Sequence, residues 1–174
     1  MRRVLAGGLA LVCLAALGCG GGGGTGGGED GSDGGAIPAC TGGTIECEVL
    51  ALVNAERAAQ SPALPPLGFS TLLQDAALFH NDWMVANGCF AHVCGGEAEV
   101  PLRIAQAGYS AAGWAETIAA GYPTPEAVVA GWMGSPGHRA ILLGDFSEVG
   151  IAYTACPGGC AYGAYWTADF ANPQ

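Results

Sequence analysis

Apolar residues recur at helical spacing in two segments of the chain. Within residues 46–60 they fall on one side of the helix that this spacing predicts, with Val49 near its start. Within residues 71–87 they recur every four positions; Ser70 can cap the first turn and Gly88 follows the last residue. We therefore expect an amphipathic helix over each segment.

Proline and hydroxyl residues mark the beginnings of shorter helices. Thr124-Pro125-Glu126 supplies a capping hydroxyl, a proline at the first helical position and an acid in the first turn, so we expect a helix to Met133. Ser135-Pro136 repeats this arrangement before a short helix that Gly144 ends. A further short helix is expected over residues 102–107.

Beyond these helices the apolar spacing changes from helical to alternating. Large residues alternate with small ones over 149–153 and again over 162–170, which predicts two strands of a hairpin with a turn at 156–160. Residues 114–119 are expected to be extended or irregular. Because helices come first and an antiparallel sheet follows, the chain favours an α+β domain with helices layered on the sheet.

The amino-terminal segment has the order of an export signal. Arginines follow Met1, then an apolar run over residues 4–17, then small residues. The run is shorter than the roughly 20 apolar residues that span a bilayer, and glycines interrupt it. We therefore expect residues 1–18 to be a signal peptide that is removed on export, in preference to a transmembrane anchor.

The residues before Cys19 resemble a bacterial lipobox, in which the cysteine receives lipid. Ala16 stands where the lipobox usually has leucine, so secretion without lipid is the alternative. Residues 19–36 are mostly glycine and cannot bury apolar surface, which favours a flexible tether. The expected organisation is a lipoprotein-type signal over 1–18, this tether, and one folded domain over 37–174. Its expected location is extracellular or in the cell envelope, with the membrane as a partner through lipid on Cys19.

The charge of the chain argues against a nucleic-acid partner. Its 174 residues include 15 acidic side chains and five basic ones, for a net charge of −10, and lysine is absent. Contacts to phosphate need clustered lysine and arginine. Acidity by itself indicates solubility and names no partner.

Six of the eight cysteines lie beyond the signal and the expected lipid site. In an oxidising compartment disulfides are the default state, and the six cysteines fall into three local pairs. Six cysteines allow fifteen pairings, so the local scheme is a hypothesis. The pairs are Cys40 with Cys47, Cys89 with Cys94, and Cys156 with Cys160.

Three histidines are candidates for chemistry. His80 lies on the apolar row of its helix, and we interpret it as a buried residue with one hydrogen bond. His92 lies between Cys89 and Cys94, where a disulfide would hold a rigid loop. A zinc site made of these three loop residues is disfavoured because oxidised cysteine binds zinc poorly. His138 is expected in the first turn of its helix, where the dipole disfavours a positive charge.

A neutral His138 suits a metal ligand or a base, although the same helix start could hold an anion, or the imidazole could simply bond nearby backbone. Glu116 is an acid in an apolar stretch, and a buried carboxylate needs a partner, for which a histidine is the obvious choice. Ser135 lies near His138, but its hydroxyl is better explained as a helix cap. These residues predict a histidine and carboxylate cleft of unassigned purpose.

Five segments, taken in order, resemble the bacterial branch of the CAP superfamily, which groups cysteine-rich secretory proteins, antigen 5 and pathogenesis-related proteins. The likeness covers most of residues 50–170. It implies a three-layer α-β-α sandwich with a central antiparallel sheet and a cleft. The segments are residues 52–57, the loop around His92, residues 103–109, residues 114–119 and residues 132–142.

The resemblance also implies the composition of the cleft. His92, Glu116 and His138 match family positions that in some members bind a divalent metal, such as zinc or calcium. Thr117 replaces a usual asparagine, and Ser135 stands where a second glutamate would be, which weakens a metal site.

No single reaction unites the family, so function must be argued from the site. The leading hypothesis is a surface-tethered binding module for a small ligand, a lipid or a divalent metal. The alternatives are a metal-assisted hydrolase and an adhesion module whose cleft has no activity.

Overall fold

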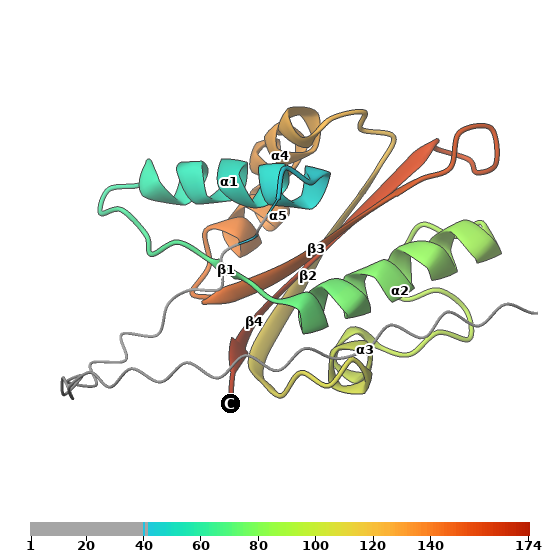
Figure 1. Ribbon diagram of the computed structural model, residues 1–174, viewed down its shortest axis with the longest axis horizontal. Helices are drawn as coiled ribbons and strands as arrows, with labels where there is room; N and C mark the ends of the chain where they lie inside the picture. Colours follow the sequence, from blue (N-terminus) through green and yellow to red (C-terminus); the bar gives the residue numbers. More distant parts are fainter. Residues whose placement is uncertain (1–39, 41) are drawn as a thin grey trace, which may run out of the picture. The chain divides into compact units, whose positions relative to one another are not determined.

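The protein is described by a computed structural model, which covers Cys40 and residues 42–174. Figure 1 shows its helices on either side of a twisted sheet. The signal 1–18, the tether 19–36 and Cys19 lie outside the described residues. The described helices are α1 (Ile45–Ala58), α2 (Thr71–Asn87), α3 (Val100–Gln106), α4 (Pro125–Gly134) and α5 (Pro136–Leu142). The described strands are β1 (Gly68–Phe69), β2 (Ala111–Ala120), β3 (Glu148–Ala155) and β4 (Ala164–Pro173).

The four described strands form one sheet in the order β1-β3-β4-β2. Strands β3 and β4 are the predicted hairpin, and β2 pairs antiparallel with the other side of β4. The stretch expected to be extended or irregular lies within this ten-residue strand, whose pairing with β4 shifts register once, between Ala111 and Gly113. The expected α+β class is confirmed, with one addition: β1 pairs parallel with β3, which makes the sheet mixed.

Helices cover both faces of the sheet (Figure 1). Helices α1, α4 and α5 lie over one face, where Val53, Trp132 and Trp166 belong to the largest apolar cluster. Helices α2 and α3 lie over the other face, where Leu73 and Ile104 share a smaller cluster. The predicted layering of helices on a central sheet is therefore confirmed.

Local sequence signals account for most helix ends. The hydroxyls of Ser70 and Thr124 accept hydrogen bonds from the third residue beyond each cap, as predicted. Gly88 ends α2 with a φ of 61°, a conformation that glycine adopts without steric cost. Ser135 was expected to cap α5, but its side chain makes no cap hydrogen bond. Pro136, with its fixed φ, begins that helix without the hydroxyl.

The three local disulfides are present in the structure. They join Cys40 to Cys47, Cys89 to Cys94 and Cys156 to Cys160, with Cα–Cα distances of 5.5, 6.1 and 5.7 Å. The last of them spans the turn of the β3–β4 hairpin, and the alternating pattern had predicted this turn at residues 156–160. Each bridge closes a short segment and joins no distant elements.

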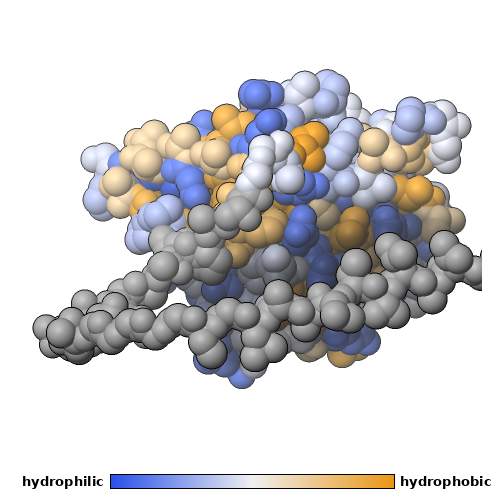
Figure 2. Space-filling view, in the orientation of Figure 1, coloured by the Kyte–Doolittle hydropathy of each residue, from blue (hydrophilic) through white to orange (hydrophobic). Residues whose placement is uncertain are grey.

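The surface mixes polar and apolar residues on the face that Figure 2 shows. Within the part of the chain that the structure describes, none of the helices has the length and apolar character needed to cross a bilayer.

Candidate functional site

Glu116 in β2 is the centre of a buried polar network. Its side chain is almost fully buried, and its two carboxylate oxygens have different partners. Oε1 accepts a hydrogen bond from His92 Nδ1 at 2.7 Å, and Oε2 accepts one from Arg103 Nη2. The histidine partner expected for Glu116 is thus present, together with an arginine that the sequence interpretation did not foresee.

Arg103 in α3 fixes the loop that carries His92. Its guanidinium is buried and also donates to the main-chain oxygens of His92 and Ala98, at 3.2 and 2.9 Å. Arg103 binds both the backbone of this loop and the carboxylate of Glu116. It therefore orients the His92 imidazole and its carboxylate partner together.

The second ring nitrogen of His92 makes no hydrogen bond to the described residues. A carboxylate can only accept, so Nδ1 carries the proton that Glu116 binds, and Nε2 is left for another partner. The imidazole is half exposed, with 52 % of the side chain accessible. The hydrogen bond to Glu116 raises the pKa of His92, and partial burial opposes this only in part. His92 therefore keeps its second proton to a higher pH than a free imidazole does.

His138 lies at the start of α5 and is partly buried. Burial is the main cause of its lowered pKa, and the positive charge of His92 lowers this pKa further. The two imidazoles are thus close enough to influence each other, and His138 favours the neutral form that the helix start had suggested. Ser135 is partly buried at the junction of α4 and α5, and no side-chain hydrogen bond joins it to His92 or Glu116 among the described residues.

His80 is fully buried with one hydrogen bond, which confirms the interpretation from sequence. Its Nδ1 donates to Glu97 Oε1 at 2.6 Å, and its Nε2 lies 4.0 Å from Glu116 Oε1. Glu97 also accepts from the amide of Cys94 at 3.0 Å and lies 3.5 Å from Arg103. The network therefore continues beneath His92 through residues that the sequence did not single out.

Asp169 in β4 is a further member of the buried polar network around Glu116. It pairs with Glu116 across the β2–β4 ladder, so the two side chains lie on the same face of the sheet. Its carboxyl group is fully buried and has no hydrogen-bond partner among the described residues. Burial, followed by the negative charge of Glu116, raises the pKa of Asp169 well above its usual range. Asp169 is therefore expected to be a neutral acid at physiological pH.

A pocket of about 400 Å³ opens beside His92. His92, Glu99 and Glu116 form its polar wall. Much of the rest is apolar, including Trp114, which is exposed to 44 % of its surface, together with Val100 and Ile141. This arrangement suits a small molecule with one polar group and an apolar body.

The donor set does not suit a divalent metal. Over the described residues, no three His, Cys, Asp or Glu side chains are grouped to hold an ion. Glu116 uses both oxygens within the network, and the cation of Arg103 beside it repels a second positive charge. Metal binding by His92, Glu116 and His138 stays a prediction, and the geometry weighs against it.

Comparisons with known proteins place the chain in a family. Residues 50–170 match the pattern of the Cysteine-rich secretory protein family, CAP. The uncharacterised protein YkwD of Bacillus subtilis is 34 % identical over 128 residues, which is 72 % of this chain and 46 % of that protein. The chain thus spans less than half of that relative.

Solved structures agree in fold. An extracellular protein of Bacillus anthracis that contains an SCP domain matches 72 % of this chain and 39 % of its own, with 25 % identity and a TM-score of 0.62. An outer surface protein of Borrelia burgdorferi matches 72 % of this chain and 90 % of its own, with 19 % identity and a TM-score of 0.64. From the match over residues 50–170 and the shared fold, the chain belongs to the CAP, or cysteine-rich secretory protein, family.

Proposed function

We propose that this protein is an envelope-bound binding module whose His92 pocket holds a small amphipathic molecule. The observation that carries the proposal is the half-exposed His92 imidazole, held by Glu116 at 2.7 Å, at the mouth of a largely apolar pocket. A cationic imidazole with a free Nε2 can donate to a carboxylate or carbonyl oxygen. Trp114 and Ile141 can bury the apolar part of the same molecule.

The position of Arg103 and Glu116 supports binding through His92. Their buried charges fix the imidazole before any ligand arrives, which reduces the entropy lost on binding. The same network also supports a purely structural interpretation, in which the cleft binds nothing. A binding experiment distinguishes these two interpretations, because altering His92 changes the affinity for a ligand only if His92 forms part of its binding site.

Decanoate is a suitable probe because it has one carboxylate and an apolar chain. We expect saturable binding by the full chain, detected by calorimetry below its micelle-forming concentration. His92→Ala should weaken binding by roughly tenfold, the usual effect of removing a charge-assisted hydrogen bond. Affinity should also fall as pH rises through the elevated pKa of His92.

Arg139→Ala is the matched control, because Arg139 is an exposed cation on α5 and does not line the pocket. Equal decanoate affinity in the wild type and in the His92→Ala, His138→Ala double variant would remove the proposal. Decanol, which keeps the chain and lacks the charge, should bind more weakly than decanoate if His92 acts as a cation.

Hydrolysis is a second candidate because His138 favours the neutral form that a general base needs. The described cysteines are all in disulfides and cannot serve as nucleophiles, and in this candidate a bound water attacks the substrate. Hydrolysis of p-nitrophenyl acetate that disappears in the double histidine variant would support this candidate. A rate that persists in that variant would count against it.

Attachment to the membrane through lipid on Cys19 is proposed separately, from the sequence. Relatives described as extracellular or outer surface proteins support an exported location. Cys19→Ser should move the protein from the membrane fraction to the soluble fraction of bacterial cells that express it. Continued recovery in the membrane fraction would contradict a lipid on this cysteine.

A further inference from the structure

The outer edge of β2 has main-chain groups without a partner. The order β1-β3-β4-β2 places β2 at the end of the sheet, and among the described strands it pairs with β4 alone. Gly121 N donates to Ala164 O at 3.0 Å, directly beyond the last pair of this ladder. Because such bonds recur at every second residue of an antiparallel pair, the main-chain groups of Trp114 and Glu116 face away from β4. They have no hydrogen-bond partner among the described residues.

The His92 pocket opens along this free edge. Successive residues of a strand point to opposite faces, yet Ala115 and Glu116 both line the pocket. Its walls include Val100 of α3 and Ile141 of α5, and these two helices cover opposite faces of the sheet (Figure 1). The pocket therefore extends around the edge of β2. Walls on both faces suit one extended chain better than the edge of a second folded sheet.

Toward α4 the same edge is closed. The main-chain groups of Ile118 also face away from β4, but Ile118 O accepts a hydrogen bond from Trp132 Nε1 at 3.3 Å. The free main-chain groups of Trp114 and Glu116 thus belong to the part of β2 that lines the pocket.

Glu99 gives this pocket a charge that can attract a partner. It lines the pocket, is exposed, and forms no ion pair with any described residue. The other carboxylate of the pocket, Glu116, already binds His92 and Arg103. A partner with a basic side chain near Glu99 would complement this charge.

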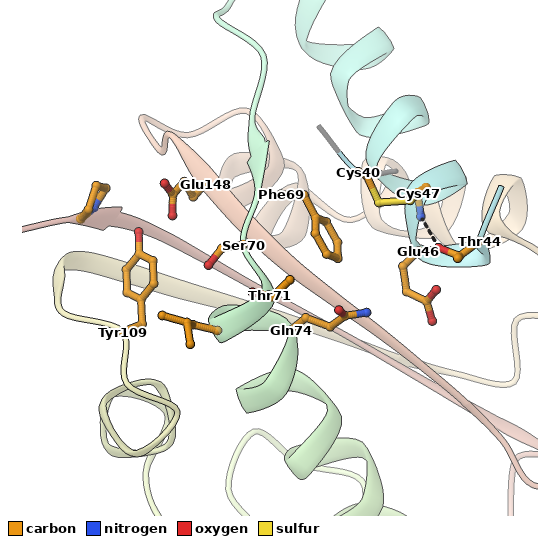
Figure 3. Close-up of a pocket in the computed structure, with 12 residues that line it drawn as sticks. Cys40, Thr44, Glu46, Cys47, Phe69, Ser70, Thr71, Gln74, Tyr109 and Glu148 are labelled. Carbon is orange, nitrogen blue, oxygen red and sulfur yellow. Dashed lines mark hydrogen bonds between the residues drawn. A yellow bond between two sulfur atoms is a disulfide. The ribbon is translucent and has the colours of Figure 1, made fainter. Parts of the chain in front are cut away.

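A second pocket, of about 580 Å³, gives no such indication of a ligand. It lies where the first turns of α1 and α2 approach the start of β3, and Figure 3 shows its Tyr109 hydroxyl directed toward Glu148. Burial, and then a hydrogen bond to Glu148, raise the pKa of Tyr109. This buried phenol therefore has a partner within the protein, unlike the free edge of β2.

We infer that the free edge of β2 binds an extended peptide that carries a basic side chain. The peptide adds a strand to the sheet by pairing its main chain with Trp114 and Glu116, and its basic side chain lies near Glu99. The inference rests on the His92 pocket being a binding site, as proposed above, and adds main-chain recognition to that site.

The test is a calorimetric titration of the full chain with the capped pentapeptide Thr-Val-Lys-Val-Thr. The expected result is saturable binding with one site for each chain. Amides of an extended peptide alternately face β2 and face away. N-methylation of both valines, or of the lysine and the last threonine, should therefore have unequal effects, with a loss of roughly tenfold or more for one pattern only. Equal effects of the two patterns, or no saturable binding, would overturn the inference.

Trp114→Pro and Trp114→Ala form a matched pair of variants. Both remove the indole, but only proline removes the outward N–H, which pairing with β4 does not need. The proline variant should bind the peptide roughly tenfold more weakly than the alanine variant, while the two bind decanoate equally. Equal peptide affinities in two folded variants would contradict the inference, and the methylated peptides decide it should the proline variant fail to fold. Decanoate binding without peptide binding would remove this inference and leave the proposed function.

Glu99→Gln tests the charge, and Glu126→Gln is its control because Glu126 is exposed on α4 and does not line the pocket. Glu99→Gln should weaken peptide binding by roughly threefold, the effect of an exposed ion pair, and the control should not. Equal losses would show diffuse attraction to an acidic surface and overturn the inference. A dimer in analytical ultracentrifugation that Trp114→Pro dissociates would overturn it too, because a second copy of the chain would then occupy the edge.

Discussion

At the residue scale, Arg103 balances two buried carboxylates. Replacing it by methionine keeps much of its volume but leaves Glu97 and Glu116 without a cation. Removing one partner of a buried ion pair typically costs about 3–5 kcal/mol. We expect Arg103→Met to lower the free energy of unfolding by that amount in urea denaturation. Arg139→Met, at an exposed position, should change it by less than about 0.5 kcal/mol, and equal losses would contradict this account.

The pKa of His92 reports on its bond to Glu116. Because the folded-state pKa is raised, this bond stabilises the protein below about pH 6.5, and the contribution is lost as pH rises through the folded pKa. His138 has the opposite effect: because its folded-state pKa is lowered, the folded protein binds this proton less readily than the unfolded chain, and stability falls as pH drops below about 6.5. In Glu116→Gln the pKa of His92 should fall back toward 6.5, as measured by NMR of the imidazole. An unchanged His92 pKa in this variant would show that another group holds the proton.

At the element scale, the contact of α2 with β3 depends on Gly150. A Cβ at this position would lie 2.0 Å from the Gln74 nitrogen and 2.1 Å from the Leu73 carbonyl carbon, both in the backbone of α2. Gly150→Ala must therefore push the helix away from the sheet, at a cost of about 3 kcal/mol. Gly134→Ala is the control, because nothing lies within 4 Å of its added Cβ. Similar urea midpoints for the two variants would show that α2 adjusts freely.

The same helix shows how far elements could be predicted from sequence. Apolar spacing and end signals located α2 from Thr71 to Asn87, because both depend on residues near in sequence. Strand β1 was missed because two residues carry no alternation, and its pairing with Glu148 is long-range. Ser135 matched a cap by residue type, but a hydroxyl's rotamer is not determined by sequence spacing.

The residues of the candidate site also fall into two groups: those that the sequence could identify and those that it could not. Glu116 stood out because its neighbours are apolar, and His92 because cysteines flank it. Asp169 carried the same signal as Glu116, an acid within an alternating apolar strand, and could have been found by it. Arg103 and Glu97 could not, because their burial follows from the docking of α3 and the His92 loop against β2.

At the scale of the whole molecule, stability depends on three short cross-links. Their sequence separations are 7, 5 and 4, and closing loops of this size contributes about 2 kcal/mol each in the chain-entropy description. The combined contribution, about 6 kcal/mol, falls within the 5–15 kcal/mol that holds a typical domain together. Full reduction should therefore leave the domain only marginally stable, with a much lower urea midpoint. An unchanged midpoint after verified reduction would contradict this.

The cross-links should differ in what their loss affects. Cys156→Ala with Cys160→Ala frees only the hairpin turn, so stability should fall by about 2 kcal/mol while decanoate affinity is kept. Cys89→Ala with Cys94→Ala frees the loop that presents His92, so a similar loss of stability should be joined by weaker decanoate binding. Calorimetry and urea denaturation on both variants make the comparison. Equal affinities would mean that Arg103 and Glu97 hold the loop without the disulfide, whereas a selective loss would show that this disulfide is needed to order the binding site as well as the fold.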